Sequence, residues 1–192
     1  MNRPVLSVDP RVLRTHEGVV AATVALLVEC GFERITIEAI AERSGVARST
    51  IYRNWDTRAD LLVAAFEQMC AFREIPDLGS LDAELRIVAE DLANGLTREQ
   101  WGVILPSLVG ASFCDPELAE AQRRFADHRR VMVAEVFTRA ITRGEIDGRH
   151  EPGHLAEQFA AGFFFRHLMA QRPIDGPFID RQLAMLAQLT AG

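Results

Sequence analysis

The sequence has no lysine and no long apolar run. All 21 basic residues among its 192 are therefore arginines, and the 27 acidic residues leave a formal net charge of −6. This balance excludes a globally basic protein that coats nucleic acid, but it is compatible with a local basic patch. Uncharged apolar runs such as 19–28 fall short of the roughly 18 residues that a membrane-spanning helix needs, and residues 1–11 lack the apolar run of a secretory signal. We therefore expect a cytoplasmic protein with no membrane partner.

Cysteine is also scarce. Cys30, Cys70 and Cys114 stand far apart, form no C-x-x-C pair and have no histidine at metal-ligand spacing beside them. This pattern argues against a disulfide framework or a zinc site, so we expect neither a metal nor a cofactor. We expect three buried thiols that behave as small hydrophobic groups; a redox switch is the alternative.

Apolar residues recur at helical spacing along the chain. They make up 48% of it and charged residues 25%, as in an ordinary globular protein. No proline stands between positions 11 and 75, and no segment alternates apolar and polar residues as a strand would. These features predict an all-α protein. The expected helices, about nine, cover residues 10–30, 37–44, 47–55, 58–72, 81–95, 97–112, 116–143, 154–171 and 177–190.

The segment 36–58 carries the most informative pattern. It places two short helices around a tight turn at 44–46, which is the layout of a helix-turn-helix. Ala41 is small where the second helix must approach closely, and Gly45 can adopt the left-handed conformation that a β-carbon disfavours. Ile51 then supplies part of the apolar wedge between the two helices.

The second of these helices has two distinct faces. At helical spacing, Ala47, Ile51 and Trp55 fall on one side. The opposite side carries Arg48, Ser49, Tyr52, Arg53 and Asp56. Positions 43 to 58 hold four arginines and one aspartate, a local charge of +3 where a DNA duplex would dock. The pattern favours DNA binding; the alternative is a pair of amphipathic helices in a bundle with arginine on its surface.

The same stretch resembles a known family. The residues that carry the resemblance are Gly31-Phe32, Thr36-Ile37, Ile40-Ala41, Gly45-Val46, Ser49 to Arg53, Trp55, Arg58 and Leu61-Leu62. Over about residues 11 to 72 the chain resembles the N-terminal domain of the TetR family of bacterial transcriptional regulators.

This resemblance implies a set of DNA contacts. Thr36 would cap its helix and touch a phosphate, and Thr50 would bind the backbone. Arg48, Ser49 and Tyr52 would face the major groove. Arg53 would contact the groove or a phosphate, and Arg58 stands where the family usually has a lysine that reaches a phosphate.

The resemblance also implies a homodimer, in which the last two helices pair with their copies. Phe163 to Phe165 point in three directions on one helical turn, so at least one is exposed unless another subunit covers it. The predicted interface residues are Phe164, Phe165, Leu168, Leu183 and Leu186. A dimer would read a palindromic operator whose half-site centres are about 10 bp apart or a multiple of that.

By the same resemblance, the helices between would surround an effector pocket. Its predicted lining residues are Trp101, Leu105, Phe125, His128, Met132, Phe163 and His167. They favour a mostly apolar small molecule, although plain core packing is the alternative for each of them. The Arg-rich stretch 123–130 is expected to be a solvated face, with ion pairs such as Glu120 with Arg124 and Glu135 with Arg139; a second nucleic-acid site is the alternative.

The turn-rich segment 75–80 indicates a domain boundary. We predict a helix-turn-helix domain at 1–57, a connecting helix at 58–75 and an effector-binding and dimerisation domain at 76–192. The chain has no nucleophile elbow, no Gly-rich phosphate loop and no metal-ligand spacing, which argues against an enzyme. The predicted function is that of a ligand-responsive, homodimeric DNA-binding repressor; the alternative is a helical ligand-binding or adaptor protein without regulated DNA release.

Overall fold

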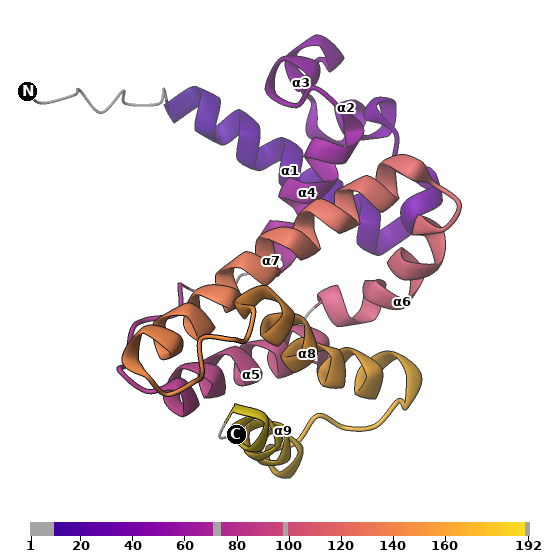
Figure 1. Cartoon of the computed structure of the whole chain (residues 1–192). Coiled ribbons are helices and arrows are strands. Elements are labelled where there is room, and N and C mark those ends of the chain that lie inside the picture. The colour runs from indigo at the N-terminus through magenta and orange to yellow at the C-terminus, as the bar shows by residue number, and fades with distance from the viewer. Residues whose placement is uncertain (1–9, 71–73, 98–99, 191–192) are drawn as a thin grey trace, which may run out of the picture. The chain divides into compact units, whose positions relative to one another are not determined.

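The computed structural model describes residues 10–70, 74–97 and 100–190, and the regular structure within these ranges is helical throughout. The helices are α1 (Pro10–Cys30), α2 (Ile37–Ser44), α3 (Arg48–Asn54), α4 (Arg58–Met69), α5 (Leu81–Thr97), α6 (Gln100–Ser112), α7 (Pro116–Arg143), α8 (Pro152–Phe164) and α9 (Gly176–Thr190) (Figure 1). A short 3-10 turn η1 (Phe32–Arg34) follows α1, and a π-helical turn η2 (Phe165–Met169) follows α8. The predicted all-α class with about nine helices is confirmed.

Local capping signals fix several helix ends where the sequence predicts them. The hydroxyl of Thr36 accepts the N–H of Ala39 at 3.1 Å and starts α2, and Gly45 ends that helix at a φ of 70°. At the start of α4, the Thr57 N–H donates to Asp60 at 2.8 Å, and the Asp60 N–H donates back to the Thr57 hydroxyl at 3.1 Å. The predicted end of α4 at Phe72 lies outside the described residues.

The chain divides into two compact units. The first comprises residues 1–69 and 107–121, and the second comprises 70–106 and 122–192. The end of α6 and the start of α7 therefore pack with the N-terminal helices. The predicted domain boundaries after residues 57 and 75 stay a prediction.

The first unit has a core of aliphatic and aromatic side chains. Helix α1 packs against α2 and α4, and Leu27, Ile40 and Phe66 on these helices are almost fully buried, as is Ile51 on α3. Trp55 is only 6% exposed, and its ring lies 4.5 Å from that of His16 on α1. This packing holds α2 and α3 on the rest of the unit.

In the second unit, α5, α8 and α9 pack together. Phe163 is fully buried there, with ring centroids 5.5 Å from Phe159 and 5.2 Å from Phe178. The fully buried carboxylate of Glu84 accepts Arg139 at 2.6 Å and lies 3.1 Å from Arg143. The expected surface pair of Arg139 with Glu135 is therefore wrong, because Arg139 turns inward to a buried carboxylate that needs a positive partner.

The cysteines are free, but only Cys70 is buried; Cys30 and Cys114 are exposed. The expectation of three buried thiols is wrong for those two, which lie at or near helix ends rather than on packed faces. Within the described ranges, no three His, Cys, Asp or Glu side chains come close enough together to hold a metal ion. Among the described helices, none combines the length and the apolar character needed to cross a membrane.

Candidate nucleic-acid interface and ligand cavity

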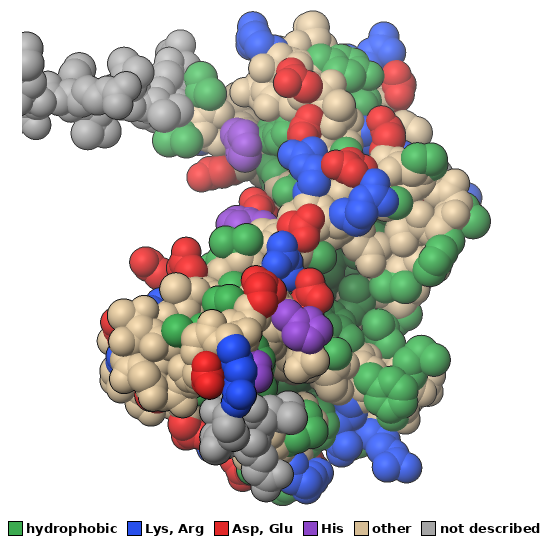
Figure 2. Space-filling view, in the orientation of Figure 1, with side chains coloured by type: hydrophobic (Ala, Val, Ile, Leu, Met, Phe, Trp, Pro, Cys, Tyr) green, Lys and Arg blue, Asp and Glu red, His purple; other side chains and the backbone are tan. Residues whose placement is uncertain are grey.

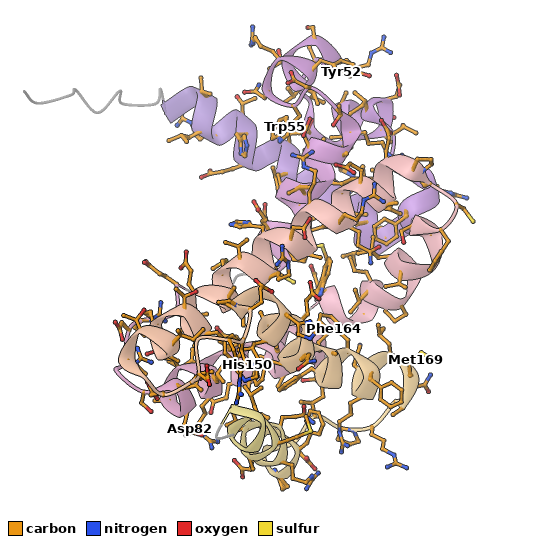
Figure 3. The ribbon with its side chains drawn as sticks, viewed as in Figure 1. Tyr52, Trp55, Asp82, His150, Phe164 and Met169 are labelled. Atoms are coloured by element: carbon orange, nitrogen blue, oxygen red, sulfur yellow. The ribbon has the colours of Figure 1, made fainter. Side chains whose placement is uncertain are left out.

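Helix α3 displays a polar face. Ile51 is fully buried beneath it, whereas Arg48, Ser49 and Arg53 are exposed and Tyr52 is 52% exposed. Figure 3 shows Tyr52 on the outside of α3. The predicted separation of the two faces is confirmed at these positions, so α3 can offer hydrogen-bond donors and an aromatic ring to a base edge or a phosphate.

Ala47 differs from its predicted place, and the hydroxyl-bearing residues Thr50 and Thr36 have partners or burial of their own. Ala47 is exposed and precedes α3, so it does not belong to the apolar face expected from helical spacing. Thr50 is half-buried, and its carbonyl accepts the side-chain amide of Asn54 at 2.8 Å. Thr36 is exposed, and its hydroxyl is already used as the cap of α2.

Carboxylates lie next to two of the arginines near α3. Arg48 donates to Glu38 at 2.9 Å, and both side chains are more than 60% exposed. The pKa of Glu38 lies below its usual range because its own backbone N–H and Arg48 donate to the carboxylate. Arg43 pairs in the same way with Glu29, which lowers the pKa of that carboxyl. Exposed pairs of this kind are weak in water, so a phosphate group can replace the carboxylate.

Arg58 is held differently. It is the first residue of α4, its side chain is 19% exposed, and its guanidinium lies 2.8 Å from Asp115 and 3.4 Å from Glu117. The structure thus brings Arg48, Ser49, Tyr52 and Arg53 together on one exposed helix, whereas Arg58 is engaged by two carboxylates.

The second unit contains a cavity of about 350 Å³. Its lining comes from α5, α6, α7 and α8 together with Cys70, and it consists of Cys70, Leu92, Gly95, Leu96, Trp101, Leu105, Gln122, Phe125, Ala126, Asp127, Arg129, Arg130, Val133, Ala156, Glu157, Ala160, Ala161 and Phe164. Three of the predicted pocket residues, Trp101, Leu105 and Phe125, are among them, and the Trp101 and Phe125 rings lie 5.0 Å apart. This volume falls within the range of small-molecule sites, about 300–1,000 Å³.

The other four predicted pocket residues lie outside this lining. His128 is exposed, and Phe163 is buried among other aromatic rings. His167 belongs to η2, where its Nε2 lies 3.1 Å from the carbonyl oxygen of Gly102. The sulfur of Met132 lies 3.7 Å from the Arg129 guanidinium.

The small and the polar residues of the cavity are not among the residues predicted from the sequence. Gly95, Ala156 and Ala160 leave room because they have little or no side chain. The spacing of Ala156 and Ala160, four apart on one helix, is the signal that could have found them. Gln122 also lines the cavity, and its Oε1 is buried without a hydrogen-bond partner among the described residues.

Charged side chains also reach the cavity from α7 and α8. Arg130 lies 3.5 Å from Glu157 and 3.7 Å from Asp127, both of which are mostly exposed. Arg129 stacks over the Phe125 ring at 5.1 Å and donates to the carbonyl oxygen of Cys70. The expectation of a wholly solvated face on this stretch is therefore wrong at Arg129.

The predicted interface residues occupy different environments. Phe164 lines the cavity, while Leu183 and Leu186 are 5% and 3% exposed within the single chain. Leu168 is half-buried in η2. Phe165 is 64% exposed, and Figure 2 shows hydrophobic side chains gathered on the surface over the end of α8.

Two family sequence profiles match the chain. The one described as "Bacterial regulatory proteins, tetR family" matches residues 19–65, and the one described as "Tetracyclin repressor-like, C-terminal domain" matches residues 75–186. The HTH-type transcriptional regulator YdeS of Bacillus subtilis is 31% identical over 180 residues, covering 93% of this chain and 90% of YdeS. The DNA-binding transcriptional repressor TetR of Mycobacteroides abscessus is 27% identical, covering 85% of this chain and 87% of the repressor. The crystal structure of the TetR family transcription regulator SCO0332 superposes with a TM-score of 0.75 at 28% identity, covering 91% of this chain and 97% of that one.

Proposed function

Because the chain belongs to the TetR family of bacterial transcriptional regulators, we propose that it is a homodimeric repressor, released from a palindromic operator when a small, mostly apolar molecule fills its cavity. The family consists of DNA-binding regulators of transcription, not enzymes. Bacterial operators lie in the cytoplasm, so we expect the repressor to act there.

The exposed face of α3 is the observation that carries the proposal. Arg48 can donate two parallel hydrogen bonds to guanine, and Ser49 and Arg53 can reach phosphates or base edges. The left-handed turn at Gly45 and the buried Ile51 set the angle at which this face is presented.

Homodimerisation is supported by the exposed apolar side chains of η2, the turn that follows α8. Phe165 and Met169 are 64% and 73% exposed, and a second copy would remove them from water. Two copies of α3, one from each chain, held about 35 Å apart can enter successive major grooves of B-DNA. The two-fold symmetry of such a dimer requires a palindromic operator.

The proposed effector is a mostly apolar molecule because the cavity that would hold it is mostly apolar. Most of the cavity lining is apolar, and Trp101 and Phe125 offer ring faces to a ligand. Such a molecule releases DNA only if it binds the DNA-incompetent conformation more tightly than the competent one.

The test is selection of duplexes from a random DNA library by the full-length protein, followed by affinity measurements on the recovered site. We expect a palindrome with half-site centres about 10 bp apart or a multiple of that, bound by two chains. A panel of lipophilic molecules is then titrated against the complex. If no sequence is enriched, the ligand-binding or adaptor alternative is favoured. If a ligand binds but does not release DNA, the protein is a regulator that binds DNA constitutively.

A further inference from the structure

We propose that Arg58 is a positioning residue that makes no phosphate contact. It fixes α2 and α3 by holding Asp115 at the start of α7. The proposal concerns how the regulator presents α2 and α3 to DNA. It differs from the role that the family resemblance implies for this position.

Arg58 stands close to the reading helix in the chain. It follows Trp55, the C-cap residue of α3, by three positions and begins α4. Its side chain is only 19% exposed, and its Nε is buried without a hydrogen-bond partner among the described residues. The guanidinium is therefore turned toward the protein rather than toward solvent, where a duplex would have to meet it.

Asp115 is itself firmly fixed. One carboxylate oxygen accepts the N–H groups of Glu117 at 3.0 Å and Leu118 at 3.1 Å, which is the geometry of a helix N-cap with Pro116 in the first helical position. The other oxygen takes Arg58 at 2.8 Å. Because both oxygens have hydrogen-bond partners, the carboxylate has a single orientation. The Arg58 guanidinium bound to it is therefore also held in one orientation.

The pair of Arg48 with Glu38 provides the contrast. Both members of that pair are more than 60% exposed, whereas Arg58 and Asp115 are 19% and 31% exposed. A phosphate can displace the single solvated carboxylate of Glu38 from Arg48. At Arg58 it would have to displace Asp115 and Glu117 together and leave a partly buried carboxylate without its cation.

The experiment measures operator affinity and its dependence on salt for Arg58→Gln, Asp115→Asn and the double variant, with Glu38→Gln as the matched control. Asparagine at 115 keeps an oxygen for the N-cap, so the helix start is preserved. We expect each single change to weaken operator binding by at least about fivefold with an unchanged salt slope. We expect the double variant to be no weaker than either single variant, because the same contact is lost in all three.

The control separates positioning from simple charge. Glu38→Gln also removes a carboxylate beside an arginine, and it should tighten DNA binding because Arg48 is released toward the duplex. If Asp115→Asn likewise tightens binding and steepens the salt slope by about one unit, Arg58 contacts a phosphate and the proposal is overturned. The proposal is also overturned if Arg58→Gln makes the salt slope shallower by about one unit while Asp115→Asn leaves operator affinity unchanged. If the parent protein and all variants bind no DNA at any salt, the proposed operator function fails instead, and the two failures are distinguishable.

Discussion

The guanidinium of Arg129 donates a hydrogen bond to the backbone carbonyl of Cys70, and both residues line the cavity. Cys70 directly follows Met69, the last residue of α4, whose first residue is Arg58. Cys70 lies one residue past the end of α4, and its carbonyl has a partner in the Arg129 guanidinium. A molecule in the cavity would contact the donor and the acceptor of this bond at once.

The first prediction concerns the response to ligand. Replacing Arg129 by alanine removes its bond to the Cys70 carbonyl, so a molecule in the cavity can no longer act through that bond. We expect Arg129→Ala to bind operator normally but to reduce ligand-induced release from the 5- to 150-fold typical of allosteric proteins to less than about twofold. The measurement is operator affinity with and without a ligand identified by thermal shift. Leu105→Val, a small change in the same lining, should weaken ligand binding and leave the release at saturation intact.

The second prediction concerns sequence reading. Arg48 is exposed at the start of α3, so Arg48→Ala should relax base preference at one position in each half-site by about 1–3 kcal/mol. A library of single-base operator variants measured against both proteins provides the readout. A uniform loss of affinity across the library would mean that Arg48 touches the DNA backbone instead.

The third prediction concerns assembly. Phe165→Asp places a charge in an exposed apolar patch, and burying it against a second copy should weaken the dimer by at least about tenfold. Phe113→Asp is the matched control, because Phe113 is 87% exposed elsewhere on the chain and should leave the dimer intact. Sedimentation velocity over a concentration series measures both. If both substitutions weaken the dimer equally, or if neither weakens it, the interface does not include the η2 turn that follows α8.

Sequence reasoning succeeded where the signal is local. Thr36 and Gly45 set the ends of α2 through contacts within four residues, so the order of residues is sufficient to predict them. The faces of α3 follow from helical spacing for the same reason, as the buried Ile51 demonstrates.

The cavity could not be predicted in the same way. Large side chains indicate Trp101, Leu105 and Phe125, but the cavity also has small lining residues such as Ala160, and which residues meet at it depends on how the helices pack. Phe164 illustrates the same point, because it lines the cavity although its position in an aromatic triplet suggested an interface.

The fourth prediction concerns the ion pair of Glu84 with Arg139, two residues that lie far apart in the sequence. Glu84 is fully buried with Arg139, 55 residues away, whereas helical spacing pairs Arg139 with the exposed Glu135. Glu84→Ala leaves two arginines beside an empty site and should cost about 3–5 kcal/mol of unfolding free energy. Glu135→Ala should stay within about 0.5 kcal/mol of the parent. Urea denaturation measures both, and a similar cost for the two variants would contradict the buried pair.

The last prediction is a dependence of stability on pH. Burial opposes ionisation of Glu145, but the Leu81 N–H, which donates at 2.8 Å, and Arg143 outweigh it and hold the pKa of this carboxyl below its ordinary 4.5. A carboxyl with a lowered pKa stabilises the folded state above the pKa of the unfolded chain, and this stabilisation is lost as the pH falls through the folded value. Water screens these interactions because Glu145 is exposed, so Glu145→Gln should reduce the unfolding free energy at pH 7 by only about 0.5 kcal/mol, and the difference between the two proteins should shrink below pH 4.5. Urea denaturation from pH 7 down to the acid transition gives the comparison, with the exposed Glu135→Gln as a variant that should differ little from the parent at any pH. A difference that grows on acidification would mean that the carboxylate of Glu145 destabilises the fold, against the hydrogen bond that it accepts at the start of α5.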